Sequence, residues 1–148
     1  CDPATNETDS TYVYALRNDP RTPLIELNDG WYGPEDWNGM PTRWIGKNAS
    51  LKIYSEKNRP ATLSLKALSF YCNRTLEIHA GKETISRQIV PTVFITVNMP
   101  INLKAGRNDL EFCIPEGCQR PCDIPEMKNG DLRCLGVAIQ NVNLTNVT

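Results

Sequence analysis

The chain has 148 residues, 16 of them Lys or Arg and 17 Asp or Glu, and its formal net charge is −1. Hydrophobic residues make up 40% and charged residues 22%, which is ordinary for a globular protein, and this length predicts a single domain over residues 1–148. The balanced charge, without a dense run of Lys and Arg, excludes a typical nucleic-acid-binding surface. No apolar stretch is long enough to span a bilayer, so we expect no membrane insertion by this segment.

The chain begins with a polar stretch, residues 1–11, which predicts an N-terminal tail. After it, apolar and polar side chains alternate with a period of two, which is typical of half-buried strands, and no helical period occurs. Turn-forming residues separate these segments. Strands are expected at residues 12–16, 23–27, 42–45, 50–53, 62–66, 75–79, 84–90, 93–99, 109–114 and 133–144.

This succession of short strands predicts an all-β fold, an antiparallel β-sandwich or jelly roll of about nine strands. Two segments change the phase of their alternation, one between Ala67 and Leu68 and the other between Gln140 and Asn141. Because a slip of one residue moves side chains to the other face of a sheet, each site predicts a β-bulge or a bend.

Six cysteines, an even number, predict disulfide bonds and therefore an oxidising compartment or a hyperthermophile cytosol. Zinc is disfavoured because the gaps between the cysteines are longer than in paired CxxC ligands, and the one histidine, His79, is distant in sequence. A chain that begins with Cys is also what remains after lipoprotein processing, and disulfide bonding is favoured over this alternative. The preferred pairs are Cys113 with Cys118, Cys122 with Cys134, and Cys1 with Cys72.

Five Asn-x-Ser/Thr sites, none with Pro in the middle, have the pattern of N-glycosylation acceptors. Chance placement of the same residues gives about two such sites. The excess favours an extracellular or cell-surface glycoprotein over a cytosolic one. The acceptor residues are Asn6, Asn48, Asn73, Asn143 and Asn146.

Several segments have an order that resembles a known family: GWYGPEDW at 30–37, RWI at 43–45, ASLKI at 49–53, LKAGRNDL at 103–110 and DLRCLGVAI at 131–139. Together they resemble the extracytoplasmic β-sandwich domains of archaeal and bacterial membrane glycosyltransferases, which look like galactose-binding and carbohydrate-binding jelly rolls. The resemblance runs from about residue 23 to residue 144 and implies a non-catalytic module that in some members binds sugar. It does not require the cysteines found between residues 113 and 134.

All the tryptophans lie between residues 31 and 44, close to acidic side chains. Flat aromatic rings beside carboxylates suit stacking on a sugar ring, so the candidate ligand-binding residues are Trp31, Trp37, Glu35 and Asp36. The alternative is packing in the core, which we favour for Trp44. Trp37, in a loop rich in Gly and Pro, is the best candidate for exposure.

Catalysis is not expected from this sequence. Glu35 and Asp36 are neighbours and point apart on an extended segment, whereas glycoside hydrolysis needs two carboxyl groups that face one substrate. His79 is expected to be exposed on the outward face of a strand, and no phosphate-binding glycine loop or calcium loop occurs, so no cofactor or metal ion is expected. Asp131 and Arg133, two residues apart at a strand entry, are expected to share a face and to pair.

The favoured function is a non-catalytic extracellular module that is glycan-binding or accessory to a cell-surface protein, so its expected partners are glycans, covalently attached or bound. The alternative is a structural subunit of an extracellular filament, sheath or surface layer. In that alternative the run from Tyr12 to Leu16 pairs with the sheet edge of a neighbouring subunit by strand addition.

Overall fold

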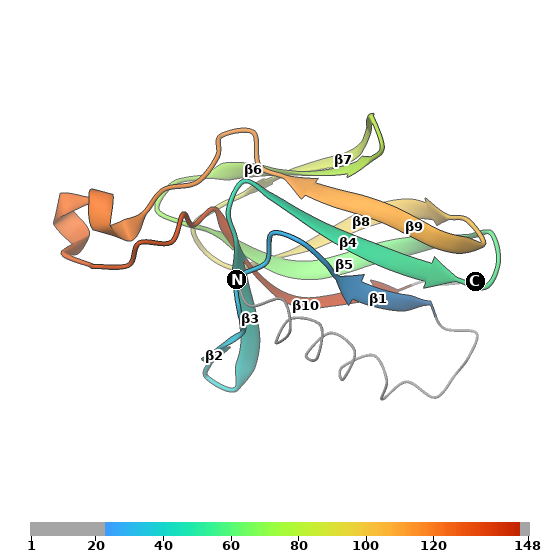
Figure 1. Cartoon of the computed structure of the whole chain (residues 1–148), viewed down its shortest axis with the longest axis horizontal. Helices are drawn as coiled ribbons and strands as arrows, with labels where there is room; N and C mark the ends of the chain where they lie inside the picture. The colour runs from blue at the N-terminus through green and yellow to red at the C-terminus, as the bar shows by residue number, and fades with distance from the viewer. Residues whose placement is uncertain (1–22, 146–148) are drawn as a thin grey trace.

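The computed structural model describes residues 23–145, which form a sandwich of two antiparallel β-sheets (Figure 1). The first sheet has the strand order β1-β4-β9-β6-β7, and the second has the order β2-β3-β10-β5-β8. The prediction of an all-β antiparallel sandwich is confirmed, with ten strands in the described residues in place of about nine. The strands are β1 (Leu24–Leu27), β2 (Glu35–Trp37), β3 (Met40–Ile45), β4 (Asn48–Ser55), β5 (Arg59–Ser69), β6 (Arg74–Ala80), β7 (Glu83–Val90), β8 (Ile95–Leu103), β9 (Gly106–Cys113) and β10 (Val137–Thr145).

The main core lies between the two sheets and is built by the alternation visible in the sequence. Leu63, Leu65 and Ala67 of β5 and Val97 and Met99 of β8 are almost fully buried in it. Removal of this apolar surface from water is the dominant favourable term in folding. The alternation of single strands was therefore sufficient to predict which of their faces form the core.

A second, smaller apolar cluster covers the outer face of the second sheet near one end. Trp44 and Ala138 are neighbours on β3 and β10 and point away from the main core, because adjacent residues of a strand face opposite sides. Phe70 packs edge-on against Trp44, with 5.8 Å between the ring centroids. Both faces of this sheet are thus covered there. The cluster consists of Trp44, Phe70, Ile124, Leu135 and Ala138, with Tyr32, Trp37, Leu68 and Phe94 packed at its margin.

This second cluster explains why one predicted bulge is wrong. The pairing of β5 with β10 stays in register through Ala67 and Leu68, because Leu68 belongs to the outer cluster while Ala67 stays in the main core. The bulge expected near Gln140 and Asn141 is confirmed, since the register of β10 against β5 shifts between Gln140 and Asn143. A further shift between Ile78 and His79 in β6 was not predicted.

The long connection between β9 and β10 contains two short 3₁₀-helices, η1 (Pro121–Asp123) and η2 (Pro125–Met127), and projects from one end of the sandwich (Figure 1). A disulfide bond joins Cys118 to Cys134 at its base. The predicted pairs of Cys113 with Cys118 and of Cys122 with Cys134 are therefore wrong. The physical reason is the β-bridge between Gln119 and Leu135, which brings the two ends of the connection side by side.

Arg74, a buried side chain at the start of β6, holds the beginning of this connection in place. Its guanidinium donates hydrogen bonds to the carbonyl oxygen of Gly117 (2.9 Å) and to Oε1 of Gln119 (2.9 Å). It also donates to the carbonyl oxygen of Phe70. One buried cation thus satisfies acceptors from two loops, as a buried charge must.

Several predictions fall outside the described residues. They are the tail at 1–11, the strand from Tyr12 to Leu16, and the acceptor sites Asn6 and Asn146. The pairing of Cys1 with Cys72 and the lipidated alternative for Cys1 also stay predictions, since they involve an undescribed residue. Within residues 23–145, no helix is both long and apolar enough to cross a membrane.

Candidate functional site

Trp31, one of the four predicted ligand-binding residues, is part of the main core. Its side chain is 1% exposed, and its ring packs edge-on against Phe112. Its indole Nε1 donates a hydrogen bond of 2.8 Å to the carbonyl oxygen of Ser50. The ring therefore offers no face to a sugar, and the core-packing alternative describes its position.

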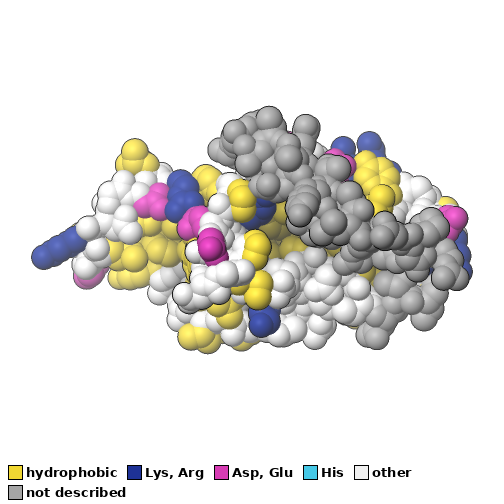
Figure 2. All heavy atoms as spheres, turned by 90° about the horizontal axis from the view of Figure 1, so that it is seen from below, with side chains coloured by type: hydrophobic (Ala, Val, Ile, Leu, Met, Phe, Trp, Pro, Cys, Tyr) yellow, Lys and Arg dark blue, Asp and Glu magenta, His cyan; other side chains and the backbone are white. Residues whose placement is uncertain are grey.

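Trp37 lies on β2 and is half-buried at the margin of the outer cluster. It meets Trp44 and Phe94 edge-on, with centroid distances of 5.7 and 5.9 Å. Its Nε1 donates to Oε1 of Glu35 at 3.2 Å. Trp37 therefore covers the buried Trp44 and keeps only part of its surface toward solvent. Figure 2 shows one face of the molecule, on which hydrophobic side chains lie among charged side chains of both signs.

Glu35 and Asp36 point to different partners, as expected for neighbours on a strand. Glu35 accepts a hydrogen bond of 2.7 Å from Nη1 of Arg133, while Asp36 accepts one of 2.6 Å from the backbone amide of Gly39 in the β2–β3 turn. Two carboxyl groups engaged in this way do not face a common substrate, so the arrangement of a glycoside hydrolase is absent at this pair.

Asp131 and Arg133 form the expected pair, although β10 begins only at Val137. Nη2 of Arg133 lies 2.7 Å from Oδ2 of Asp131, and the guanidinium carbon lies 5.6 Å from the centroid of the Tyr32 ring. The hydrogen bonds from Arg133 hold the pKa of Asp131 below its ordinary value of 3.8. Arg133 therefore bonds to both Glu35 and Asp131 beside Trp37, and these contacts stabilise the fold there.

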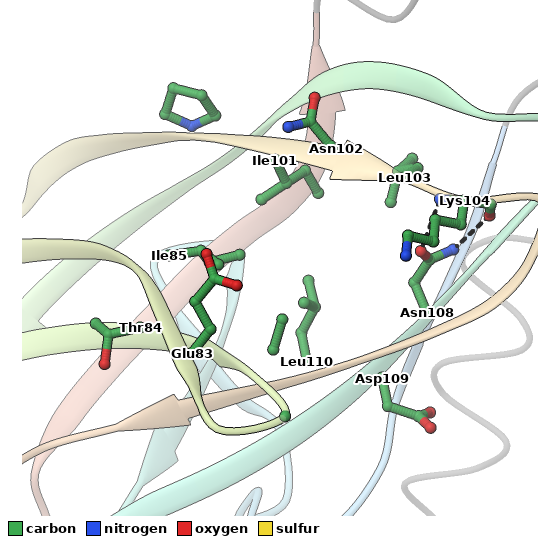
Figure 3. A pocket seen from close by; sticks show the side chains of 13 residues that line it. Glu83, Thr84, Ile85, Ile101, Asn102, Leu103, Lys104, Asn108, Asp109 and Leu110 are labelled. Atoms are coloured by element: carbon green, nitrogen blue, oxygen red, sulfur yellow. Dashed lines mark hydrogen bonds between the residues drawn. The ribbon is translucent and has the colours of Figure 1, made fainter.

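A cleft of about 610 Å³ lies between β7 and β8, each the edge strand of its sheet (Figure 3). The β6–β7 and β8–β9 turns that border it lie at the other end of the sandwich from the β9–β10 connection (Figure 1). The inner wall of the cleft is apolar: Ile101 and Leu103 of β8 point toward Ile85 of β7 and Leu110 of β9 (Figure 3). No motif in the sequence indicated it, because it forms where the edges of two sheets separate. Its polar lining side chains are Glu83, Thr84, Asn102, Lys104, Asn108 and Asp109.

Asn108 has a different role from the other polar residues of the cleft. Its amide nitrogen donates to the carbonyl oxygens of Ile53 (3.0 Å) and Lys104 (2.9 Å), and its Oδ1 accepts from the backbone amide of Lys104 (2.8 Å). Asn108 thus fixes the β8–β9 turn. Of the charged lining side chains, Lys104 is positive and Glu83 and Asp109 are negative, and Asp109 is paired with Arg107 at 3.1 Å. Within the described residues, Glu83 and Lys104 therefore contribute one unpaired charge of each sign, which suits a polar ligand of low net charge.

The sequence also gave no indication that His79 lies beside a cysteine. Nδ1 of His79 lies 3.6 Å from Sγ of Cys113, and Nε2 lies 2.8 Å from Oε1 of Glu77. Burial and the hydrogen bond to Glu111 raise the pKa of the Cys113 thiol to about 11. This thiol is therefore protonated at neutral pH, the opposite of an activated nucleophile.

No known protein-family profile matches the chain, and no curated protein is similar to it in sequence. Solved structures are similar in fold. A cycloalternan-forming enzyme from Listeria monocytogenes, solved with a pentasaccharide substrate, has a TM-score of 0.53 and 13% identity over 82% of this chain and 11% of its own. An uncharacterised protein from Listeria monocytogenes EGD-e, solved with glucose, magnesium and calcium, has a TM-score of 0.51 and 14% identity over the same shares.

A carbohydrate-binding module of Cellvibrio mixtus lichenase 5A, solved with cellotriose, has a TM-score of 0.49 and 12% identity over 83% of this chain and 91% of its own. The two Listeria structures establish a shared β-sandwich fold. Because the chain spans only 11% of each of those proteins, the likeness concerns one module of a much longer enzyme or protein.

Proposed function

We propose that the chain is a non-catalytic extracellular glycoprotein module that binds a glycan in the cleft between β7 and β8. The observation that carries this proposal is the combination of an apolar inner wall with charged and amide side chains at the rim of one cleft. Ligand sites in proteins are typically concave and combine apolar surface with polar groups that orient the ligand.

A sugar ring matches this division of the cleft. Its C–H faces can pack on Ile85, which is only partly buried, while its hydroxyl groups can bond with Glu83 and Lys104 at the rim. The volume of about 610 Å³ can hold one or two sugar rings. Two structures that share the fold contain saccharides, which supports this ligand class.

Two described glycan acceptors support an extracellular location. Asn48 and Asn73 are exposed, so an attached glycan would extend into solvent. The disulfide between Cys118 and Cys134 fits an oxidising compartment as well. The resemblance of the sequence to domains of membrane glycosyltransferases supports a place beside such an enzyme at the cell surface.

The region around Trp37 and Asp36 is the alternative position for the same ligand. Trp37 is half-buried and Asp36 is exposed, so a sugar could reach both. The cleft is favoured because the contacts of Trp37 and Glu35 already close the outer cluster.

Calorimetric titration of the full chain with a panel of oligosaccharides tests both positions. The variants Glu83→Gln and Lys104→Met are expected to weaken binding about tenfold, the loss that follows when a polar contact to a ligand is removed. Asp36→Asn, and the exposed Glu126→Gln as a matched control, are expected to leave binding unchanged. If only Asp36→Asn and Trp37→Ala weakened binding, the ligand would bind at the alternative position and not in the cleft. The absence of binding to any sugar would overturn the proposal.

A further inference from the structure

Three side chains of different chemistry converge on the outer face of the first sheet. β6 and β9 are neighbours there, and their register sets Glu77 opposite Cys113 and His79 opposite Glu111. One donor atom each from His79, Glu111 and Cys113 lie within 4.8 Å of one another. An imidazole, a carboxylate and a thiol form a donor set typical of zinc and other divalent transition metals.

Glu77 orients the histidine for this purpose. Its side chain is 7% exposed, and Nε of Arg87 donates to its Oε2 at 2.8 Å. Its other oxygen, Oε1, lies 2.8 Å from Nε2 of His79, which places the ring proton on Nε2 and leaves the lone pair of Nδ1 directed toward Cys113. A carboxylate behind a histidine is the usual second partner of a metal-binding imidazole.

The spacing of the donors also fits a metal ion. Zinc bonds of about 2.3 Å to sulfur and about 2.0 Å to nitrogen or oxygen, at tetrahedral angles, separate sulfur from the other donors by about 3.5 Å. In this protein, Sγ of Cys113 lies 3.6 Å from Nδ1 of His79 and 3.4 Å from Oε1 of Glu111. Glu111 is exposed, so its carboxylate can rotate to complete the geometry.

We propose that His79 Nδ1, Cys113 Sγ and a carboxylate oxygen of Glu111 bind one zinc ion, with water at the fourth position. The ion replaces the thiol proton, which passes to solvent, so that a sulfur–zinc bond forms as the sulfur–hydrogen bond breaks. Arg87 balances the charge of Glu77, so the thiolate and Glu111 supply the two negative charges that neutralise the ion. This site is independent of the proposed glycan function.

The test is metal binding by the full chain after treatment with a chelator, with the Cys118–Cys134 disulfide intact and Cys113 kept as a thiol. Zinc is expected to bind at one equivalent and to shift the NMR signals of His79, the single histidine of the chain. Cobalt, used as a spectroscopic probe, is expected to give a sulfur-to-metal charge-transfer band. The variants Cys113→Ser and His79→Gln should lose about tenfold or more in zinc affinity, and Cys113→Ser should lose the cobalt band.

Cys72→Ser is the matched control, because it removes an exposed thiol from a different loop. It should bind zinc and cobalt as the wild-type chain does. A second measurement needs no variant: zinc should slow the alkylation of Cys113 in the wild-type chain. Equal zinc affinity in Cys113→Ser, or alkylation of Cys113 at the same rate with and without saturating zinc, would overturn the proposal.

Discussion

Arg133 and Glu35 form an ion pair across 98 positions of sequence, with 2.7 Å between Nη1 of the arginine and Oε2 of the glutamate. The contact joins the end of the β9–β10 connection to the edge strand β2. Arg133 also binds Asp131 and lies against the Tyr32 ring. One guanidinium thus contacts Glu35, Asp131 and Tyr32, beside the outer cluster.

Replacement of this guanidinium should destabilise the fold. Arg133→Ala removes hydrogen bonds to two carboxylates and the ring contact, and we expect a loss of about 1–2 kcal/mol in the free energy of unfolding, measured by urea denaturation. Arg120→Ala is the control, because Arg120 and Asp123 form an exposed pair three residues apart, and its expected cost is about 0.5 kcal/mol or less. Equal effects of the two variants would contradict a structural role of Arg133.

The disulfide should contribute more than any of these polar contacts. Cys118 and Cys134 are separated by 16 residues, and closing a loop of this length stabilises a fold by about 3 kcal/mol. The double variant Cys118→Ala/Cys134→Ala should lose about this amount, whereas Cys122→Ala should lose little. A peptide map of the unreduced protein in which Cys122 is linked to Cys134 would contradict the pairing.

The sequence predicted strand faces well because alternation is a local property. Every strand expected within residues 23–145 is present, and the buried faces of β5 and β8 follow from their side-chain period. β2 was missed because it has three residues in a segment rich in Gly and Pro, and it is stabilised by pairing with β3 and by Trp37 against Trp44.

The contacts between distant residues that form the His79–Cys113 cluster and the disulfide could not be predicted from alternation. His79 and Cys113 are 34 residues apart and meet only because β6 lies beside β9. The pairing of Cys118 with Cys134 likewise depends on the bridge between Gln119 and Leu135. Such relationships follow from strand order, which alternation along single strands does not specify.

Acid should destabilise the protein through carboxylates whose pKa values are lowered by their partners. The hydrogen bonds from His79 and Arg87 lower the pKa of Glu77 from 4.5, and those from Arg133 lower the pKa of Asp131 from 3.8. A lowered folded-state pKa gives stability that is fully present above the unfolded value and is lost as the pH falls toward the folded value.

The urea midpoint should therefore be nearly constant from about pH 7 to about pH 5 and should decrease below about pH 4.5. Asp131→Asn removes one of these carboxylates, so its midpoint should be lower at neutral pH and should change less on acidification. If Asp131→Asn lost as much stability between neutral and acid pH as the wild-type chain does, Asp131 would not contribute to the acid dependence.

Gly136 should not tolerate a side chain. A Cβ atom at this position would collide with the carbonyl oxygen of Gly46 and lie 2.8 Å from Cδ1 of Ile114. Gly136→Ala should therefore cost about 1–3 kcal/mol, as overpacked sites do. Gly33→Ala is the matched control, since no atom outside its chain neighbours lies within 4 Å of a Cβ there, and its thermal midpoint should be almost unchanged.

Glycan occupancy should follow the exposure of the acceptor amides if the chain is made in a secretory pathway. Asn48 and Asn73 are exposed, whereas Asn143 lies within β10, is half-buried, and donates from Nδ2 to the carbonyl oxygen of Asn141 at 2.7 Å. Enzymatic removal of glycans in heavy-oxygen water marks each occupied site by a mass shift. Asn48 and Asn73 should be marked in most molecules and Asn143 in few, because the half-buried, hydrogen-bonded side-chain amide of Asn143 is less accessible to the transferase than the two exposed amides. Full occupancy of Asn143 would mean that the glycan is attached before β10 joins the sheet. The absence of glycan from both Asn48 and Asn73 would contradict the proposed extracellular glycoprotein.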